Sequence, residues 1–151
     1  MKLELHPAMA HAFVEAEAAG ARGEVPVGAC VTAPDGSILT SAGNRTRELN
    51  DPTAHAEMLV IREAGRLLGS ERLIGCDLHV TLEPCAMCAA AISFARIARL
   101  YFGADDEKMG AVDNGPRFFA QPTCHHAPDV YSGLGEKTSR DLLTHFFRTR
   151  R

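Results

Sequence analysis

The stretch Leu78-His79-Val80-Thr81-Leu82 runs directly into Glu83-Pro84-Cys85-Ala86-Met87-Cys88, and this junction decides how the chain is organised. The first five residues form a short, largely apolar run with β-branched members, which predicts a strand. Proline is favoured at the first position of a helix, so Pro84 predicts a helix that continues to about residue 95. A strand that leads at once into a helix is typical of an α/β protein.

Alternating helix and strand patterns on both sides of this junction extend the same plan. Apolar spacing predicts helices and short apolar runs predict strands; the helices cover 7–21, 52–68 and 136–151, and the strands 27–33, 38–41 and 100–102. The turn at 34–36 predicts an antiparallel hairpin, whereas strands connected through helices favour parallel pairing. Residues 103–135 collect Gly, Pro, Asp and His and predict long loops with short elements.

Four residues at two predicted helix starts form a candidate metal and acid–base site. Cys85 and Cys88 lie three residues apart, so they share a helix face, and the positive end of the helix dipole lowers the pKa of thiols there. His55 supplies a third ligand, and Glu57 lies near it without binding the metal. Three protein ligands with an open fourth position are typical of catalytic zinc, whereas structural zinc sites have four.

Such a site predicts hydrolytic chemistry. Zinc lowers the pKa of a bound water to about 7, which makes hydroxide the nucleophile. Glu57 can take the water's proton and return it to a ring nitrogen and to the leaving group, so the reaction is the loss of ammonia from an amidine-like carbon. A thioredoxin-like redox pair is the alternative interpretation of Cys85 and Cys88. We interpret Cys124-His125-His126 as part of a polar loop, and a second metal-binding tract is the alternative.

Composition limits the class of protein further. The chain has 151 residues and a formal charge of −3, which excludes a strongly basic nucleic-acid coat and an acidic disordered tail. No apolar stretch reaches membrane-spanning length, and the N-terminus lacks a signal-peptide pattern, so we expect a cytoplasmic protein with no membrane partner. Five cysteines do not indicate a disulfide framework, and we expect Cys30 and Cys76, which fall in apolar surroundings, in the core.

The pairing of His55-Ala56-Glu57 with Pro84-Cys85-Ala86-Met87-Cys88 resembles the motif of the zinc-dependent nucleobase deaminases of the cytidine deaminase superfamily. Residues 102–110 and 146–151 resemble the tRNA-editing branch of that family, and the likeness covers nearly the whole chain. The resemblance implies one zinc-dependent deaminase domain over 1–151, with a three-layer α/β/α fold and a mixed, mainly five-stranded sheet. It also implies a homodimer with one zinc per subunit.

The resemblance assigns roles to individual residues. The implied zinc ligands are His55, Cys85 and Cys88, and the implied proton shuttle is Glu57. The implied substrate-binding residues are Asn44, Val27, Ala56 and Asp106. Among these, Asn44 hydrogen-bonds the flipped base, Val27 lines its pocket, and Asp106 contacts the RNA backbone or ribose. Two segments depart from the family pattern: residues 45–50 lack the proline that often follows Asn-Arg, and residues 113–132 differ.

The implied reaction is hydrolytic deamination of the wobble adenosine to inosine in the anticodon stem-loop of an arginine tRNA. Local basic residues support an RNA partner: Arg45, Arg47, Arg96, Arg99, Arg148, Arg150 and Arg151. The enzymatic alternative is a guanine or cytosine deaminase that acts on a free base or nucleoside. A non-catalytic zinc-binding structural or RNA-chaperone module is the alternative from another class.

Overall fold

The computed structural model describes residues 6–150, so the predictions about the first five residues and about Arg151 lie outside the described part. The elements follow the order α1 (Pro7–Ala21), β1 (Gly28–Thr32), β2 (Ile38–Gly43), α2 (Ala56–Leu68), β3 (Asp77–Leu82), α3 (Ala86–Phe94), β4 (Arg99–Ala104), η1 (Phe118–Ala120), β5 (Asp129–Tyr131) and α4 (Glu136–Thr149). None of the helices within 6–150 is long and apolar enough to cross a membrane.

The strands form one mixed sheet in the order β2-β1-β3-β4-β5. β1 pairs antiparallel with both β2 and β3, whereas β3, β4 and β5 run parallel to one another. The predicted hairpin and the parallel strands connected through helices are therefore confirmed. Because β1 lies between β2 and β3, the connection through α2 passes over one strand before the chain re-enters the sheet.

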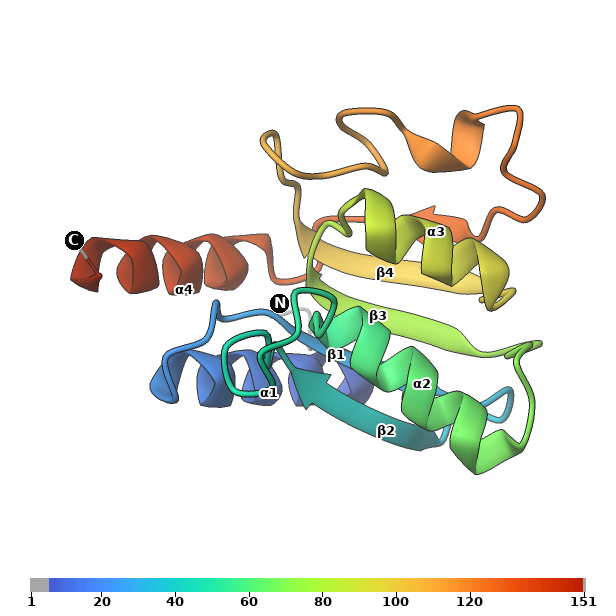
Figure 1. Cartoon of the computed structure of the whole chain (residues 1–151), viewed down its shortest axis with the longest axis horizontal. Coiled ribbons are helices and arrows are strands. Elements are labelled where there is room, and N and C mark those ends of the chain that lie inside the picture. The colour runs from blue at the N-terminus through green and yellow to red at the C-terminus, as the bar shows by residue number, and fades with distance from the viewer. Residues whose placement is uncertain (1–5, 151) are drawn as a thin grey trace, which may run out of the picture.

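Helices cover both faces of the sheet, as the three-layer prediction requires. α2 and α3 lie side by side on one face, and α1 and α4 lie on the other (Figure 1). The alternation along β3 follows from this arrangement, because successive side chains of a strand point to opposite faces. Leu78 and Val80 belong to the main core, while His79 stacks against Tyr101 on the α1 side. Cys30 is fully buried in the second cluster.

Two helices begin later than the sequence predicts, for local reasons. The helix expected from residue 52 begins at Ala56, because the Asp51 carboxylate accepts hydrogen bonds from the Thr53 backbone N–H and hydroxyl at 2.8 and 2.7 Å and holds a turn there. The helix expected from Pro84 begins at Ala86, with Cys85 as its N-cap. The irregular region contributes β5, which pairs with β4.

Because of His79, the free energy of unfolding is expected to decrease at acidic pH. Its side chain is buried, its ring stacks on His6 and Tyr101 at 5.2 and 4.8 Å, and its Nδ1 has no hydrogen-bond partner among residues 6–150. Burial, reinforced by His6, lowers the pKa of His79 from 6.5 to about 4. The unfolded chain therefore binds a proton below pH 6.5 that the folded chain accepts only near pH 4.

Stability is therefore expected to be full above pH 6.5 and to fall by about 3 kcal/mol as the pH drops to 4, at about 1.4 kcal/mol per pKa unit. Urea denaturation at several pH values measures this loss, and His79→Phe, which keeps an aromatic ring in the stack, should flatten the curve. Parallel curves for the wild type and His79→Phe would contradict this account.

Candidate metal centre and active site

The candidate site lies where the first turns of α2 and α3 meet at one end of the sheet. His55 is the N-cap of α2 and Cys85 is the N-cap of α3, and both have extended backbone angles. Neither side chain makes a capping hydrogen bond to its own helix, so both are free to face a ligand. Because the positive ends of two helix dipoles point to this place, it favours thiolates and other anions.

Three side chains converge there at the distances that zinc requires. The Nδ1 atom of His55 lies 3.6 Å from the Sγ atom of Cys85 and 3.5 Å from that of Cys88. The three ligand atoms all lie within 4.8 Å of one another. Tetrahedral zinc with bonds of about 2.3 Å to sulfur and 2.0 Å to nitrogen separates its ligands by roughly 3.5–3.8 Å. The donor set and its spacing therefore fit zinc.

The two sulfur atoms shift each other's pKa in opposite directions. The pKa of Cys85 falls to about 4, chiefly because the Cys88 thiol donates a hydrogen bond to its sulfur, while burial opposes the shift. The same hydrogen bond, together with burial, raises the pKa of Cys88. The arrangement thus favours the thiolate form of Cys85, and zinc binding would displace the proton of Cys88, because thiolates rather than thiols bind zinc.

Glu57 is a buried carboxyl beside the three candidate ligands. It lies in the first turn of α2 and is only 4% exposed. Burial raises its pKa to about 6, with a further contribution from the charge of Cys85. Among the described residues, the three-ligand cluster does not include Glu57. A buried carboxyl that titrates close to neutral pH can both accept and donate a proton.

The pocket residues form a connected structure around the start of α2. The Oδ1 atom of Asn44 accepts a hydrogen bond of 2.8 Å from the backbone N–H of Ala56, and its Nδ2 donates to the carbonyl of Val25 at 3.1 Å. Val27 is buried and its carbonyl accepts from the backbone N–H of Asn44. An amide group has two N–H donors, so Asn44 keeps a second N–H beside the one that bonds Val25, while its oxygen holds the start of α2.

Asp106 lies in the turn that follows β4. Its Oδ1 atom accepts hydrogen bonds from the backbone N–H groups of Lys108 and Met109 at 3.0 and 3.1 Å. The acidic turn is therefore capped by its own side chain, an arrangement typical of aspartate. Since a carboxylate has about four acceptor positions, these two bonds leave room for a further donor.

Three of the predicted basic residues lie in two different parts of the structure. Arg96 and Arg99 follow α3 at its C-terminal end, a helix length away from the ligands at its N-terminus, and Arg99 pairs with Asp77 at 3.8 Å. By contrast, Arg150 lines a cleft that α4 shares with residues 105–109, and its guanidinium lies 4.8 Å from the ring centroid of Phe146. Arg150, the C-cap of α4, thus lies at the same cleft as residues 105–109.

The tract at 124–126 packs as a polar loop. Cys124 donates from Sγ to the carbonyl of His126 at 3.1 Å, and Nε2 of His126 lies 2.7 Å from the carbonyl of Ile97. Within residues 6–150, this tract does not contribute to a cluster of metal-ligating atoms. These contacts fasten the loop to the end of α3, so the polar-loop interpretation is the one the structure supports.

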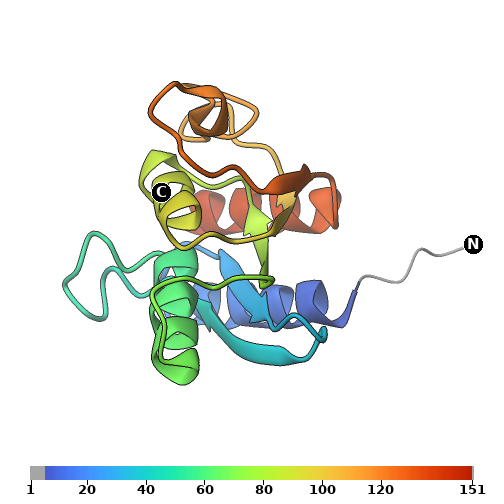
Figure 2. The ribbon, with the colours of Figure 1, turned by 90° about the vertical axis from the view of Figure 1, so that its right-hand side faces the viewer.

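Glu24 is a site residue that sequence reasoning missed. This carboxylate is 2% exposed and accepts the backbone N–H groups of Arg47 and Glu48 at 3.1 and 3.0 Å. Burial tends to raise its pKa, but the hydrogen bonds from these N–H groups outweigh burial and leave the pKa below its ordinary value. Glu24 thereby holds the loop after Asn44, which Figure 2 shows projecting from the body beside α2. Sequence carries no signal for such a contact, because the partners lie more than twenty residues apart.

Comparison with known proteins places this site in a family. The sequence profile described as the cytidine and deoxycytidylate deaminase zinc-binding region matches residues 3–104. A tRNA-specific adenosine deaminase of Agrobacterium fabrum is 66% identical over 140 residues, which cover 93% of this chain and 91% of that protein. The protein of the same name from Rickettsia bellii is 43% identical over 93% of this chain and 97% of its own.

Solved structures give the same picture. A structure from a study of A-to-I editing by tRNA:A34 deaminases at the wobble position of transfer RNA superposes with a TM-score of 0.88 and 65% identity, over 90% of this chain and 98% of that chain. Guanine deaminase from Bacillus subtilis is more distant, with a TM-score of 0.64 and 28% identity over 97% and 95% of the two chains. The three-layer fold with a mixed five-stranded sheet is therefore confirmed.

Proposed function

The chain belongs to the cytidine and deoxycytidylate deaminase family, and from that premise we propose that it hydrolyses the wobble adenosine of a tRNA to inosine. The observation that carries this proposal is the identity of 66% to a tRNA-specific adenosine deaminase over nearly the full length of both proteins. The guanine deaminase alternative is supported less well, because this chain is only 28% identical to the guanine deaminase of Bacillus subtilis. We further propose an arginine tRNA as the substrate.

The proposed mechanism assigns the site residues complementary tasks. His55, Cys85 and Cys88 would hold zinc, which supplies the Lewis acidity that makes a water nucleophilic near neutral pH. Glu57 would accept one proton of that water and deliver it to the ring nitrogen, and would then carry the second proton from the hydroxyl on the reacting carbon to the departing amino group, so that adenosine and water yield inosine and ammonia. Its buried position and raised pKa support both transfers.

The proposed substrate contacts surround this centre. Asn44 would hydrogen-bond the flipped base with its remaining N–H, and Val27 and Ala56, which are both buried next to Asn44, would line the base pocket. Asp106 would contact the ribose or backbone beside the target nucleotide. Extruding a base from its stack is required, because the reacting carbon is inaccessible within stacked RNA.

We also propose that residues 1–151 act as one deaminase domain, that the chain forms a homodimer with one zinc per subunit, and that it works in the cytoplasm. Phe94, which ends α3 and is 75% exposed, supports an interface on the α2–α3 side, because a large exposed apolar side chain gains stability when a partner covers it. Light scattering of the purified chain tests the dimer, and a mass of 16.3 kDa for the scattering species would refute it.

A paired substrate assay tests the proposed function. An arginine tRNA anticodon stem-loop should acquire inosine at the wobble position, whereas guanine, cytosine and free adenosine should release little ammonia. The affinity for the stem-loop should fall steeply with salt, because each neutralised phosphate releases counterions. Rapid ammonia release from guanine or cytosine without inosine in the RNA would instead select the free-base alternative.

A further inference from the structure

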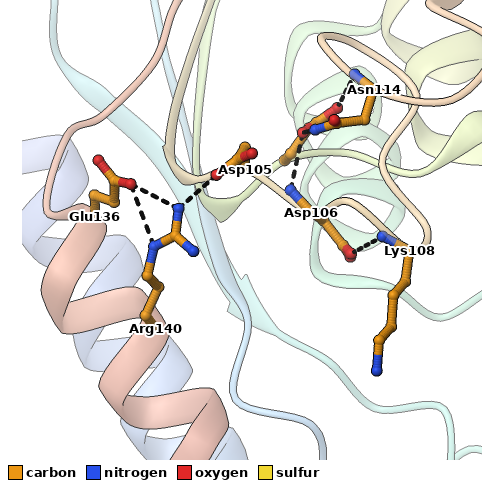
Figure 3. A network of polar contacts seen from close by, with 7 residues as sticks. Asp105, Asp106, Lys108, Asn114, Glu136 and Arg140 are labelled. Carbon is orange, nitrogen blue, oxygen red and sulfur yellow. Dashed lines mark hydrogen bonds and ion pairs between the residues drawn. The ribbon is translucent and has the colours of Figure 1, made fainter.

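A loop without regular structure, residues 105–117, connects β4 to η1. Its first five residues form one wall of an open cleft of about 900 Å³, and Arg140, Leu143 and Phe147 of α4 form part of the opposite wall. Arg140 donates to the Asp105 carboxylate at 2.6 Å and to Glu136 at 2.7 Å (Figure 3). Arg140 thus connects the two walls of the cleft on the α4 side.

Glu83 is the buried group that holds this loop. Its side chain directly follows β3 and is only 3% exposed. Its Oε1 atom accepts from the Asp106 backbone N–H at 2.9 Å and from the Asn114 side chain at 2.7 Å. Its Oε2 atom accepts the backbone N–H groups of Val112, Asp113 and Asn114 at 3.0, 2.9 and 3.0 Å.

Five donors converge on one carboxylate, so only the ionised form satisfies them all. Glu83 makes no ion pair with any residue of the described chain 6–150. A buried carboxylate without a cation is costly unless hydrogen bonds replace its water shell, and here every such bond comes from one loop. The loop and the carboxylate therefore depend on each other.

The same loop is attached to the segment that carries a zinc ligand. The backbone N–H of Ala111 donates to the carbonyl of Pro84 at 2.9 Å, and Gly110 forms an isolated bridge with Cys85. A Cβ atom added at Gly110 would overlap the Glu83 carboxylate and the carbonyl of Asp106. The fit between the loop and the Glu83–Cys85 segment is thus tight, and it sets the cleft wall relative to the candidate metal centre.

We infer that Glu83 is a positioning residue that presents residues 105–109 to the RNA substrate. This inference rests on the proposed tRNA function, because it requires the loop to touch the nucleic acid. Glu83 acts only through the loop, since its carboxylate is already occupied by five protein donors. Removal of the Glu83 carboxylate should therefore weaken substrate binding, while the chemical step at the metal centre continues.

Glu83→Gln tests this inference, because the amide has the same shape but replaces one acceptor with a donor that opposes backbone N–H groups. We expect the KM for the tRNA stem-loop to rise about tenfold, equivalent to about 1.4 kcal/mol, with kcat within about twofold of the wild type. The zinc content should be unchanged. Amide hydrogen exchange over 106–114 should accelerate about tenfold. Glu71→Gln, on an exposed glutamate of a distant loop, is the matched control and should behave as the wild type.

Gly110→Ala provides a second route, because its added Cβ atom pushes the loop away from Glu83 while Glu83 keeps its own carboxylate. It should give the same selective rise in KM. Unchanged exchange in Glu83→Gln, or faster exchange with unchanged KM, would overturn the inference, as would zinc loss in Glu83→Gln combined with a normal KM in Gly110→Ala. A wild-type chain inactive on tRNA refutes the proposed function instead, and the exchange measurement still decides whether Glu83 holds the loop.

Discussion

Glu57→Gln is expected to abolish deamination of the tRNA substrate while the chain keeps its zinc. The amide occupies the same buried position in the first turn of α2, but it can neither accept the proton of water nor return it to the base. General acid–base catalysis contributes about 10²–10⁴-fold to a rate, and Glu57 would serve every proton transfer of the reaction. We therefore expect kcat to fall by at least about 10³-fold, measured as inosine formed in single-turnover assays.

Glu63→Gln is the matched control, because Glu63 lies on the same helix and its exposed carboxylate pairs with Arg66. It should retain full activity and full zinc content. If Glu57→Gln loses zinc, the residue contributes to holding the metal, and if it retains activity, the proton shuttle lies elsewhere. Either result would contradict the role proposed for Glu57.

Cys88→Ser is expected to remove both zinc and activity. Cys88 is fully buried, and its sulfur lies 3.5 Å from Nδ1 of His55, so a hydroxyl in its place leaves only two good ligands. Zinc content measured by atomic emission should fall from about one ion per chain to near zero. Added zinc should raise the thermal unfolding midpoint of the wild type, because ligands stabilise the state that binds them, but should leave that of Cys88→Ser unchanged.

Cys124→Ser separates this effect from the general consequences of removing a thiol. Cys124 donates to the carbonyl of His126, and a serine hydroxyl can make the same hydrogen bond. This variant should bind zinc and deaminate as the wild type does. Zinc loss in Cys124→Ser, or zinc retained in Cys88→Ser, would show that the ligand set differs from His55, Cys85 and Cys88.

Local sequence patterns predicted the regular elements well where the pattern is long. The helix expected over 7–21 has the same bounds as α1, because alanine-rich helical spacing ends at glycines close to its C-terminus. β5 was not predicted as a separate strand, because three residues inside an irregular region carry too little periodicity, and β4 supplies its pairing. The start of α2 was misplaced because a side-chain turn at Asp51 competes with the helix.

The convergence of ligands could be predicted because His55, Cys85 and Cys88 each stand at a recognisable helix start. The loop anchors could not, since Glu24 and Glu83 are ordinary glutamates in the sequence. Their function depends on backbone N–H groups that tertiary structure brings to them. A carboxylate that serves a loop far along the chain leaves no spacing pattern, which is why these two residues emerge only from the folded structure.

Placing ligands at two helix caps also has a consequence for the order in which the protein assembles. His55 and Cys85 are thirty positions apart, and the folded sheet, in which β1 pairs with β3, brings their helices together. The unfolded chain therefore offers only the Cys85–Cys88 pair, a weaker chelator than the completed site. Zinc binding is thus coupled to completion of the sheet, so that zinc stabilises the folded chain over the unfolded one.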